Sequence, residues 1–156
     1  MIIKKIKYEQ LPDFLDCCEK YLKWVDENTS ASYEWCIEEA TKRFYEVMKN
    51  GVIFVALESE KIIGSLAIEV VKFFMSKEKV GSEIVWHCND DLTSRQKYRV
   101  LKKLADYARF WAMDNGIDRL VFSAASYNPS VKLLKNSGFV ESETFYEKEF
   151  KNGCKT

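Results

Sequence analysis

The chain has 156 residues, of which 47% are hydrophobic, and its 24 Lys and Arg residues balance its 24 Asp and Glu residues. This length predicts a single domain over residues 1–156, with enough apolar side chains for a sizeable core. The neutral net charge argues against a general affinity for nucleic acid, so a phosphate ligand would have to be attracted by local charges.

The cysteines and the hydropathy pattern indicate a cytoplasmic protein without a metal site. The five cysteines are odd in number and lack metal-type spacing, and His87 is the single histidine. Reduced thiols are therefore the expectation, and we predict no zinc site. No apolar run approaches the roughly 20 residues of a membrane span, and none follows Met1 to Lys5. We expect neither a membrane segment nor a signal peptide.

Periodicity in the first half of the chain predicts a strand, two helices and a β-hairpin. Apolar residues recur at helical spacing in both helices, and Asn50-Gly51 ends the second one. A near-continuous apolar run then indicates a buried strand, and its hairpin partner is expected to bend near Gly64. These elements are expected at residues 2–8, 11–23, 33–50, 52–57 and 62–74.

The second half of the chain predicts a strand–helix–strand unit followed by a short helix and a last strand. The long helix carries an apolar stripe and ends at Asn115-Gly116. Such a unit implies a parallel pair of strands joined by a right-handed crossover. Residues 76–81 are mostly polar and are expected to form a connection. The elements are expected at residues 83–88, 94–115, 120–124, 129–136 and 145–150, with a short extended segment at Phe139-Val140 before the last of them.

The long helix begins with a concentration of positive charge. Its first turns carry Arg95, Lys97, Arg99, Lys102 and Lys103. Cations at a helix N-terminus are unfavourable by several tenths of a kcal/mol each, whereas a bound phosphate is favourable there. We therefore expect an anion at this helix start, although cations are also ordinary on a solvated helix face. Thr93 and Gln96 form a capping-box pattern, which gives Gln96 a structural role beside any role in binding.

The order of the expected elements, β-α-α-β-β-β-α-β-α-β-β, resembles that of the GNAT superfamily of N-acetyltransferases. Residues 111–120 resemble the end of that family's cofactor helix and the strand after it. Residues 128–139, which finish in Gly138-Phe139, resemble its short helix, and Val85-Trp86-His87 resembles the end of its fourth strand. The resemblance implies an α/β (α+β) fold with a central mixed, mostly antiparallel sheet of six to seven strands flanked by about four helices.

The resemblance also implies acetyl-CoA, or another acyl-CoA, as the co-substrate. The family's signature, Gln/Arg-x-x-Gly-x-Gly/Ala, holds the pyrophosphate with backbone N–H groups, and it corresponds here to residues 96–101. Gln96 matches, but Arg99 replaces the first glycine and Leu101 replaces the final small residue. The backbone of the fourth strand would bind the pantetheine arm. The residues implied for binding are Val85, Trp86, Arg95, Gln96, Lys97, Tyr98, Arg99, Val100, Leu101 and Asn128.

Two side chains of the predicted fourth strand are candidates for a general base. Acyl transfer to an amine needs a deprotonated ammonium group, for which a base with a pKa near neutrality is suited. Glu83, Val85 and His87 are expected on one strand face, so Glu83, directly or through a water, and His87 are the candidates. Tyr146 is the candidate acid, because Leu134 stands where the family has its tyrosine. A core histidine, a surface glutamate and a cross-strand aromatic are the structural alternatives.

Two functions stay open from the sequence. The first is an acyl-CoA-dependent N-acyltransferase, which transfers acetyl from acetyl-CoA to a small-molecule or peptide amine by direct attack. The second is a GNAT-fold binding or structural module without catalysis, which Leu101 and Leu134 favour. A third reading, in which the basic helix touches nucleic acid, is opposed by the neutral net charge. GNAT-like proteins often dimerise, so a homodimer is also an expectation.

Overall fold

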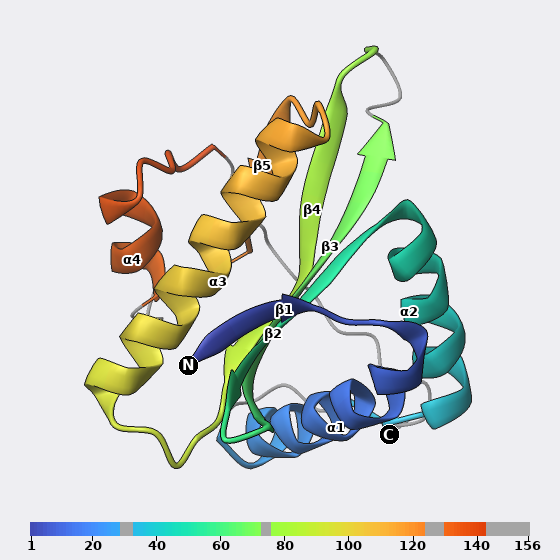
Figure 1. Ribbon diagram of the computed structural model, residues 1–156, viewed down its shortest axis with the longest axis vertical. Coiled ribbons are helices and arrows are strands. Elements are labelled where there is room, and N and C mark those ends of the chain that lie inside the picture. Colours follow the sequence, from blue (N-terminus) through green and yellow to red (C-terminus); the bar gives the residue numbers. More distant parts are fainter. Residues whose placement is uncertain (29–32, 73–75, 124–129, 143–156) are drawn as a thin grey trace, which may run out of the picture.

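A central β-sheet with helices on both faces forms the part of the chain that the computed structural model describes, residues 1–28, 33–72, 76–123 and 130–142 (Figure 1). Its five strands follow the order β1-β2-β3-β4-β5. The first four pair antiparallel and β5 pairs parallel with β4, so the sheet is mixed. The strands are β1 (Ile2–Lys5), β2 (Gly51–Glu58), β3 (Lys61–Lys72), β4 (Lys79–Cys88) and β5 (Arg119–Val121).

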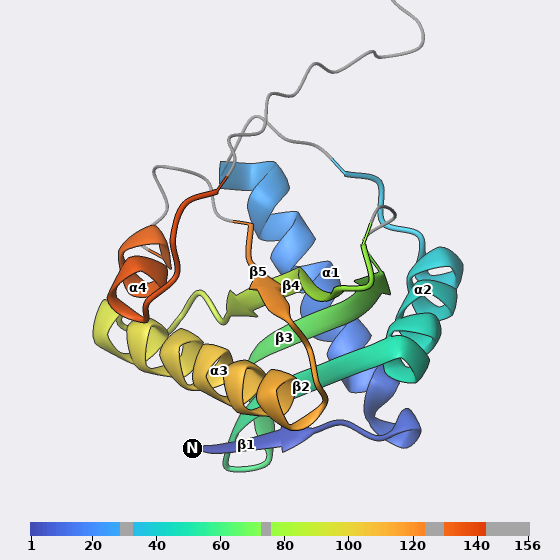
Figure 2. The ribbon, with the colours of Figure 1, turned by 90° about the horizontal axis from the view of Figure 1, so that it is seen from above.

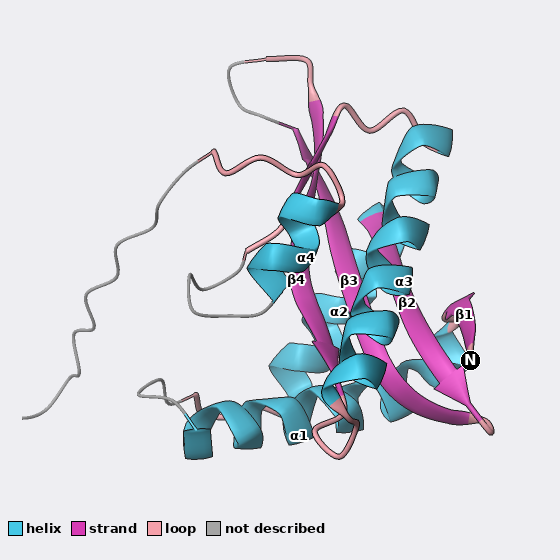
Figure 3. Cartoon of the chain, turned by 90° about the vertical axis from the view of Figure 1, so that its left-hand side faces the viewer, coloured by secondary structure: helices cyan, strands magenta, loops and turns pink. Residues whose placement is uncertain are grey.

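Four α-helices and one 3-10 turn accompany the sheet in the described ranges. They are η1 (Tyr8–Gln10), α1 (Leu11–Asn28), α2 (Ile37–Asn50), α3 (Ser94–Asp114) and α4 (Ser130–Asn136). Figure 2 shows α1 and α2 on one face of the sheet and α3 on the other. Figure 3 shows α4 beside α3. The element order and the mixed sheet agree with the α+β architecture predicted from the sequence.

Each face of the sheet has its own hydrophobic core. The first core lies against α1 and α2, and its buried residues are Ile6, Leu11, Phe14, Leu15, Cys18, Phe44, Val47, Ile53, Val55 and Ala67. The second core lies against α3, and its buried residues are Ile3, Val52, Phe54, Ala56, Leu66, Ile68, Val100, Leu104 and Ala108. Successive side chains of a strand point to opposite faces, which is why neighbouring residues of β2 and β3 alternate between the two cores.

Two helix boundaries differ from those predicted, and each difference has a local cause. α1 continues to Asn28 instead of ending at residue 23, and Val25 extends its half-buried face by one more turn. α2 starts at Ile37 instead of residue 33, because Cys36 has an extended backbone with φ −126° and ψ 106°. Both helices otherwise lie where their apolar periodicity predicts them.

The outer part of the sheet also departs from expectation. β4 starts at Lys79, where a polar connection was predicted, because its ladder with β3 reaches the Lys72–Lys79 pair. The Lys79 N–H also donates a hydrogen bond to Asp118 Oδ2 at 2.8 Å. The described residues form five strands rather than six to seven, and the strand predicted at 145–150 lies outside them. Among the described residues, no helix combines the length and apolarity needed to cross a bilayer.

A β-bulge lies between β2 and β3, close to the bend predicted at Gly64. Ala56 pairs with Gly64 and Leu57 pairs with Ile62, so β3 contains one extra residue between these pairs. Gly64 also lies under α3. A Cβ atom at this position would lie 2.5 Å from Val100 Cγ1. The glycine therefore lets α3 approach the sheet closely.

Both ends of α3 have the caps that the sequence predicts. The Gln96 N–H donates to Thr93 Oγ1 at 3.4 Å, and the Thr93 N–H donates to Gln96 Oε1 at 2.9 Å. This reciprocal pair is a capping box, which confirms the prediction. At the other end Gly116 has a φ of 63°, and the Ile117 N–H donates to Ala112 O at 2.9 Å. Glycine adopts the left-handed conformation readily, and this turn brings the following N–H to one of the last carbonyls of the helix.

Candidate active site

β4 and β5 run side by side over a short distance and then separate. Their parallel pairing consists of Val80–Arg119, Gly81–Leu120 and Ser82–Val121. β5 ends there, whereas β4 continues to Cys88. Within the described ranges, the edge of β4 from residue 83 to 88 therefore has no strand on this side. Backbone groups on such an edge can bond to an extended ligand. We call this place the fork.

Glu83 is the first residue of β4 beyond the pairing with β5. Its side chain reaches across the fork, where Oε2 accepts a hydrogen bond from the Ser123 N–H at 3.1 Å. Burial raises the pKa of this carboxyl to about 7, and the hydrogen bond opposes that rise only in part. A carboxyl that titrates near neutral pH is suited to general acid–base work. On physical grounds Glu83 is therefore a candidate for function.

A row of three aromatic rings lies at the fork on the side of the second core. Trp86, on β4, packs edge to face on Phe122, the residue after β5, with ring centroids 5.0 Å apart. Phe122 in turn packs on Phe139, which follows α4, at 5.2 Å. The Trp86 Nε1 is buried, and no residue in the described part of the chain accepts a hydrogen bond from it. The row thus links the two arms of the fork, β4 on one side and the residues after β5 on the other, to α4.

A second β-bulge places Glu83 and His87 on opposite faces of the sheet. Ala67 pairs with Val85 and Ile68 pairs with Glu83, which leaves one extra residue between them on β4. Cross-strand partners share a face, so Glu83 lies with Ile68 on the second-core side, whereas Val85 packs on the first core. The prediction that Glu83, Val85 and His87 share one face is wrong, because simple alternation holds only in a strand without a bulge.

His87 is enclosed on the first-core side, between β3 and α1. Ser65 is fully buried opposite it, with Oγ 3.3 Å from His87 Nε2. The Tyr21 ring of α1 lies 4.7 Å from the imidazole, centroid to centroid. Burial lowers the pKa of His87 to about 4, so the imidazole is neutral near pH 7. These contacts match those of a core histidine, the alternative that the sequence left open.

The residues that correspond to the pyrophosphate signature lie inside α3 rather than ahead of it. α3 starts at Ser94, and the Lys97 N–H already donates to Thr93 O at 2.8 Å. Only the first amides of a helix lack a partner within it, so residues beyond 97 have little backbone to offer a ligand. Val100 is buried in the second core and Leu101 is half-buried. The exposed side chains of this stretch are Arg95, Gln96, Tyr98 and Arg99.

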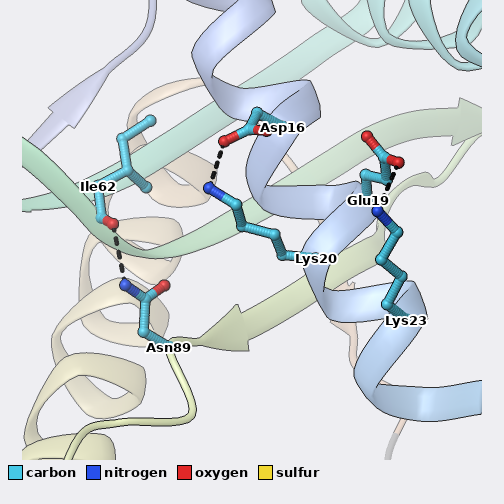
Figure 4. A network of polar contacts seen from close by, with 6 residues as sticks. All are labelled: Asp16, Glu19, Lys20, Lys23, Ile62 and Asn89. Carbon is cyan, nitrogen blue, oxygen red and sulfur yellow. Dashed lines mark hydrogen bonds and ion pairs between the residues drawn. The ribbon is translucent and has the colours of Figure 1, made fainter. Parts of the chain in front are cut away.

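The loop between β4 and α3 is anchored to the sheet and carries negative charge. The Asn89 N–H donates to Ile63 O at 3.0 Å. The side-chain Nδ2 of Asn89 donates to Ile62 O at 3.3 Å, as Figure 4 shows. Asp90 forms an ion pair with Lys97, with Oδ1 and Nζ 3.1 Å apart. The anchor holds the start of α3 close to the end of the fork, and Asp90 neutralises part of the basic cluster.

The remaining candidates divide into residues outside the described ranges and residues without a reactive environment. Tyr146 and Asn128 lie outside the described residues. Cys88 is half-buried, and burial raises the pKa of its thiol to about 11, which does not suit a nucleophile. No group of three or more His, Cys, Asp or Glu residues in the described ranges is placed to hold a metal ion.

Sequence reasoning did not identify Phe122 and Ser123 as part of this site. Ser123 acts through its backbone N–H, which every residue other than proline has, so its type carries no signal. Phe122 reads as an ordinary apolar strand residue in the sequence. Both become visible only once β4 and β5 are placed side by side.

Solved acetyltransferase structures have the same fold. A predicted acetyltransferase from Clostridium acetobutylicum, solved with acetyl-CoA, matches with a TM-score of 0.74 at 16% identity over 95% of each chain. Ribosomal-protein-alanine N-acetyltransferase from Brucella melitensis biovar Abortus 2308 matches with a TM-score of 0.73 at 13% identity, over 97% of this chain and 98% of that one. An aminoglycoside acetyltransferase from an uncultured soil metagenomic sample matches with a TM-score of 0.72 at 17% identity over 96% of each chain.

Comparisons by sequence add no relative to these structural ones. No protein-family model matches the chain, and no curated protein matches it. At identities of 13% to 17%, the structural likeness concerns the fold. The chain has the fold of the GNAT superfamily of acetyltransferases, as its sequence predicts.

Proposed function

We propose that the protein is an acyl-CoA-dependent N-acyltransferase in which Glu83 is the general base. The observation that carries this proposal is the buried carboxyl at the fork, whose pKa burial raises to about 7 and which accepts a hydrogen bond from Ser123. The GNAT fold supports it, because structures with this fold include acetyltransferases whose names specify quite different amines.

The chemistry requires a neutral amine next to a thioester. The acceptor's ammonium group loses a proton to Glu83, directly or through a water, and the free amine attacks the thioester carbon. The C–N bond forms, the C–S bond breaks, and the departing thiolate takes up a proton, for which Tyr146 is the proposed donor. The nitrogen, which carries a positive charge after the attack, loses its second proton to give the amide, and that proton restores the donor. His87 is the second candidate base, but it lies on the other face of the sheet, against Tyr21 and Ser65.

The fork and the start of α3 are suited to an acyl-CoA. Beyond Ser82 the free edge of β4, including Val85 and Trp86, offers backbone groups to the amides of the pantetheine arm, as an added strand would use them. The first amides of α3, at Ser94 and Arg95, favour the pyrophosphate. The other side chains that we propose for binding are Gln96, Lys97, Tyr98, Arg99 and Asn128.

The acceptor is proposed to be a primary amine. The names of similar structures specify an aminoglycoside in one case and a ribosomal-protein alanine in another. Both compounds present an amine that is protonated near neutral pH, which is the group that a base such as Glu83 would act on. An aminoglycoside and a peptide with an N-terminal alanine are therefore the first acceptors to test.

Titration and turnover test this proposal. Calorimetry should detect binding of acetyl-CoA, and the absence of heat at millimolar ligand would refute the proposed function. With an active acceptor, Glu83→Gln should lower kcat by about 100- to 10,000-fold, the usual contribution of a general base, with little change in the Kd of acetyl-CoA. Glu9→Gln, on the exposed turn η1, removes a carboxylate far from the fork and serves as the matched control. Equal kcat values for Glu83→Gln and the wild type would refute the assignment of the base.

A binding or structural module without catalysis is the second candidate. Two observations favour it. Asp90 and Asp91 precede α3, where they would repel a pyrophosphate, and Asp90 already pairs with Lys97. Arg99 and Leu101 also stand where the family has small residues. Turnover decides between the two candidates, because a module without catalysis forms no acylated amine from acetyl-CoA and an amine acceptor, whether or not it binds acetyl-CoA.

A further inference from the structure

The indole N–H of Trp86 is a buried donor for which the described residues provide no acceptor. More than nine in ten buried polar groups in proteins are hydrogen-bonded, so each exception needs an explanation. A phenylalanine would fill much of the same apolar space without burying a donor. The presence of an indole therefore indicates that the N–H has a partner in some state of the protein.

The position of Trp86 indicates where that partner would come from. Trp86 lies on β4 beyond Ser82, the last residue that pairs with β5. Its ring contacts Phe122 on the opposite arm of the fork, with the centroids 5.0 Å apart. The indole thus spans the fork on the side of the second core, in the stretch of β4 that has a free edge.

The fork can open at Trp86 without loss of a strand ladder. The contact between Trp86 and Phe122 is a packing of rings and includes no hydrogen bond. The hydrogen bond that the structure records across the fork nearby joins Glu83 to the Ser123 N–H. An outward movement of residues 122 and 123 would break the contact between the indole and Phe122 together with the hydrogen bond from Ser123 to Glu83.

We propose that Trp86 Nε1 donates a hydrogen bond to a carbonyl oxygen of the pantetheine arm of an acyl-CoA lying in the fork. This inference rests on the proposed function. The arm is an extended chain with two amide carbonyls and a thioester carbonyl, and each of these is an acceptor. Trp86 is then a binding residue through its side chain, in addition to the backbone of β4. Binding of the arm and release of Glu83 become one event.

Substitution of the indole by a phenyl ring tests the inference. Trp86→Phe removes the donor and keeps an aromatic ring against Phe122, and Trp111→Phe makes the same change in a half-buried residue of α3 that packs on the second core. The Kd of acetyl-CoA should rise by about 3- to 10-fold in Trp86→Phe, the effect of one neutral hydrogen bond, and should stay unchanged in Trp111→Phe.

Two further measurements keep the outcomes separate. Coenzyme A without its pantetheine arm is a phosphorylated ADP. This compound should bind the wild type and Trp86→Phe with the same Kd. In a proton–nitrogen NMR spectrum of the wild type, the Trp86 indole resonance should move downfield when acetyl-CoA binds. It is identified by elimination, as the indole signal that remains in each of Trp24→Phe, Trp35→Phe and Trp111→Phe.

Each negative result has a distinct meaning. Equal affinity of Trp86→Phe and the wild type for acetyl-CoA would overturn the inference and leave the proposed function intact. Absence of binding to either protein would overturn both. Should Trp86→Phe be poorly folded, the wild-type NMR titration decides, since an indole resonance that does not move at saturation overturns the inference.

Discussion

Replacement of Glu83 by glutamine should change how the stability of the protein depends on pH. Burial raises the pKa of this carboxyl from 4.5 to about 7. A folded-state pKa above the unfolded value means that folding favours the protonated acid. The contribution of Glu83 to stability is therefore fully present below pH 4.5 and is lost as the pH rises through 7.

The size of the effect follows from the two pKa values. One pKa unit corresponds to about 1.4 kcal/mol, so the rise from 4.5 to about 7 corresponds to about 3 kcal/mol in total. Of this, about 2.5 kcal/mol should be lost between pH 5 and pH 8. Glutamine keeps an oxygen that accepts from the Ser123 N–H but cannot ionise. Relative to the wild type, Glu83→Gln should thus become more stable by about 2.5 kcal/mol over this range.

Urea unfolding monitored by circular dichroism at pH 5, 6, 7 and 8 measures this difference. The contribution of His87 to stability also changes in part of this range, because its pKa is 6.5 in the unfolded chain and about 4 in the folded protein. The quantity to follow is therefore the free energy of unfolding of the variant minus that of the wild type. Glu9→Gln, on the exposed turn η1, provides the control for loss of one carboxylate. A difference for Glu83→Gln that stays constant within about 0.5 kcal/mol from pH 5 to pH 8 would refute the reasoning.

Four further substitutions test other parts of the structure. Burial lowers the pKa of His87 from 6.5 to about 4. Its contribution to stability is therefore fully present above pH 6.5, and the protein should lose about 3 kcal/mol of stability as the pH falls to 4. His87→Gln should lack this loss in urea titrations, and an unchanged acid dependence would contradict the burial of a neutral imidazole. Gly64→Ala places a methyl 2.5 Å from Val100 Cγ1 and should destabilise by about 1–3 kcal/mol in thermal melts. A Cβ atom at Gly116 meets no atom within 4 Å, so Gly116→Ala should destabilise by only about 1 kcal/mol, the cost of its positive φ. A larger destabilisation by Gly116→Ala than by Gly64→Ala would contradict the close approach of α3 to the sheet. Thr93→Ala removes the N-cap of α3 and should cost about 1 kcal/mol, which an unchanged melting temperature would disprove.

The order of elements could be predicted because local signals define it. In α3 the capping box at Thr93, the apolar stripe and Gly116 agree with one another, and the helix lies where they place it. The start of β4 at Lys79 could not be predicted, since it depends on pairing with Lys72 of β3 and not on the apolarity of residues 79–82.

The candidate site was predictable in its residue types but not in its geometry. Glu83 was identified because simple alternation along the predicted strand 83–88 placed it on the same face as His87, which the bulge on β4 prevents. Its raised pKa results from surrounding residues that the sequence does not place together. The bulge on β4, which separates Glu83 from His87, has no local signature, because a bulge is a property of two paired strands. Trp86 was predicted for its backbone alone, and the isolation of its N–H is visible only in the packed structure.

The short pairing of β5 has a consequence for the folding and local opening of the protein. β5 pairs with β4 through three residue pairs, whereas β3 pairs with β4 through nine. Strands with few ladder bonds open locally at a lower free energy than the central ones, so the amides of residues 119–121 should exchange with deuterium before those of β3. β5 is also reached only after the long crossover through α3, which places its docking late on the folding pathway. A ligand in the fork that contacts both β4 and β5 would slow this exchange. Mass spectrometry of the exchanged protein would then measure the binding of the ligand.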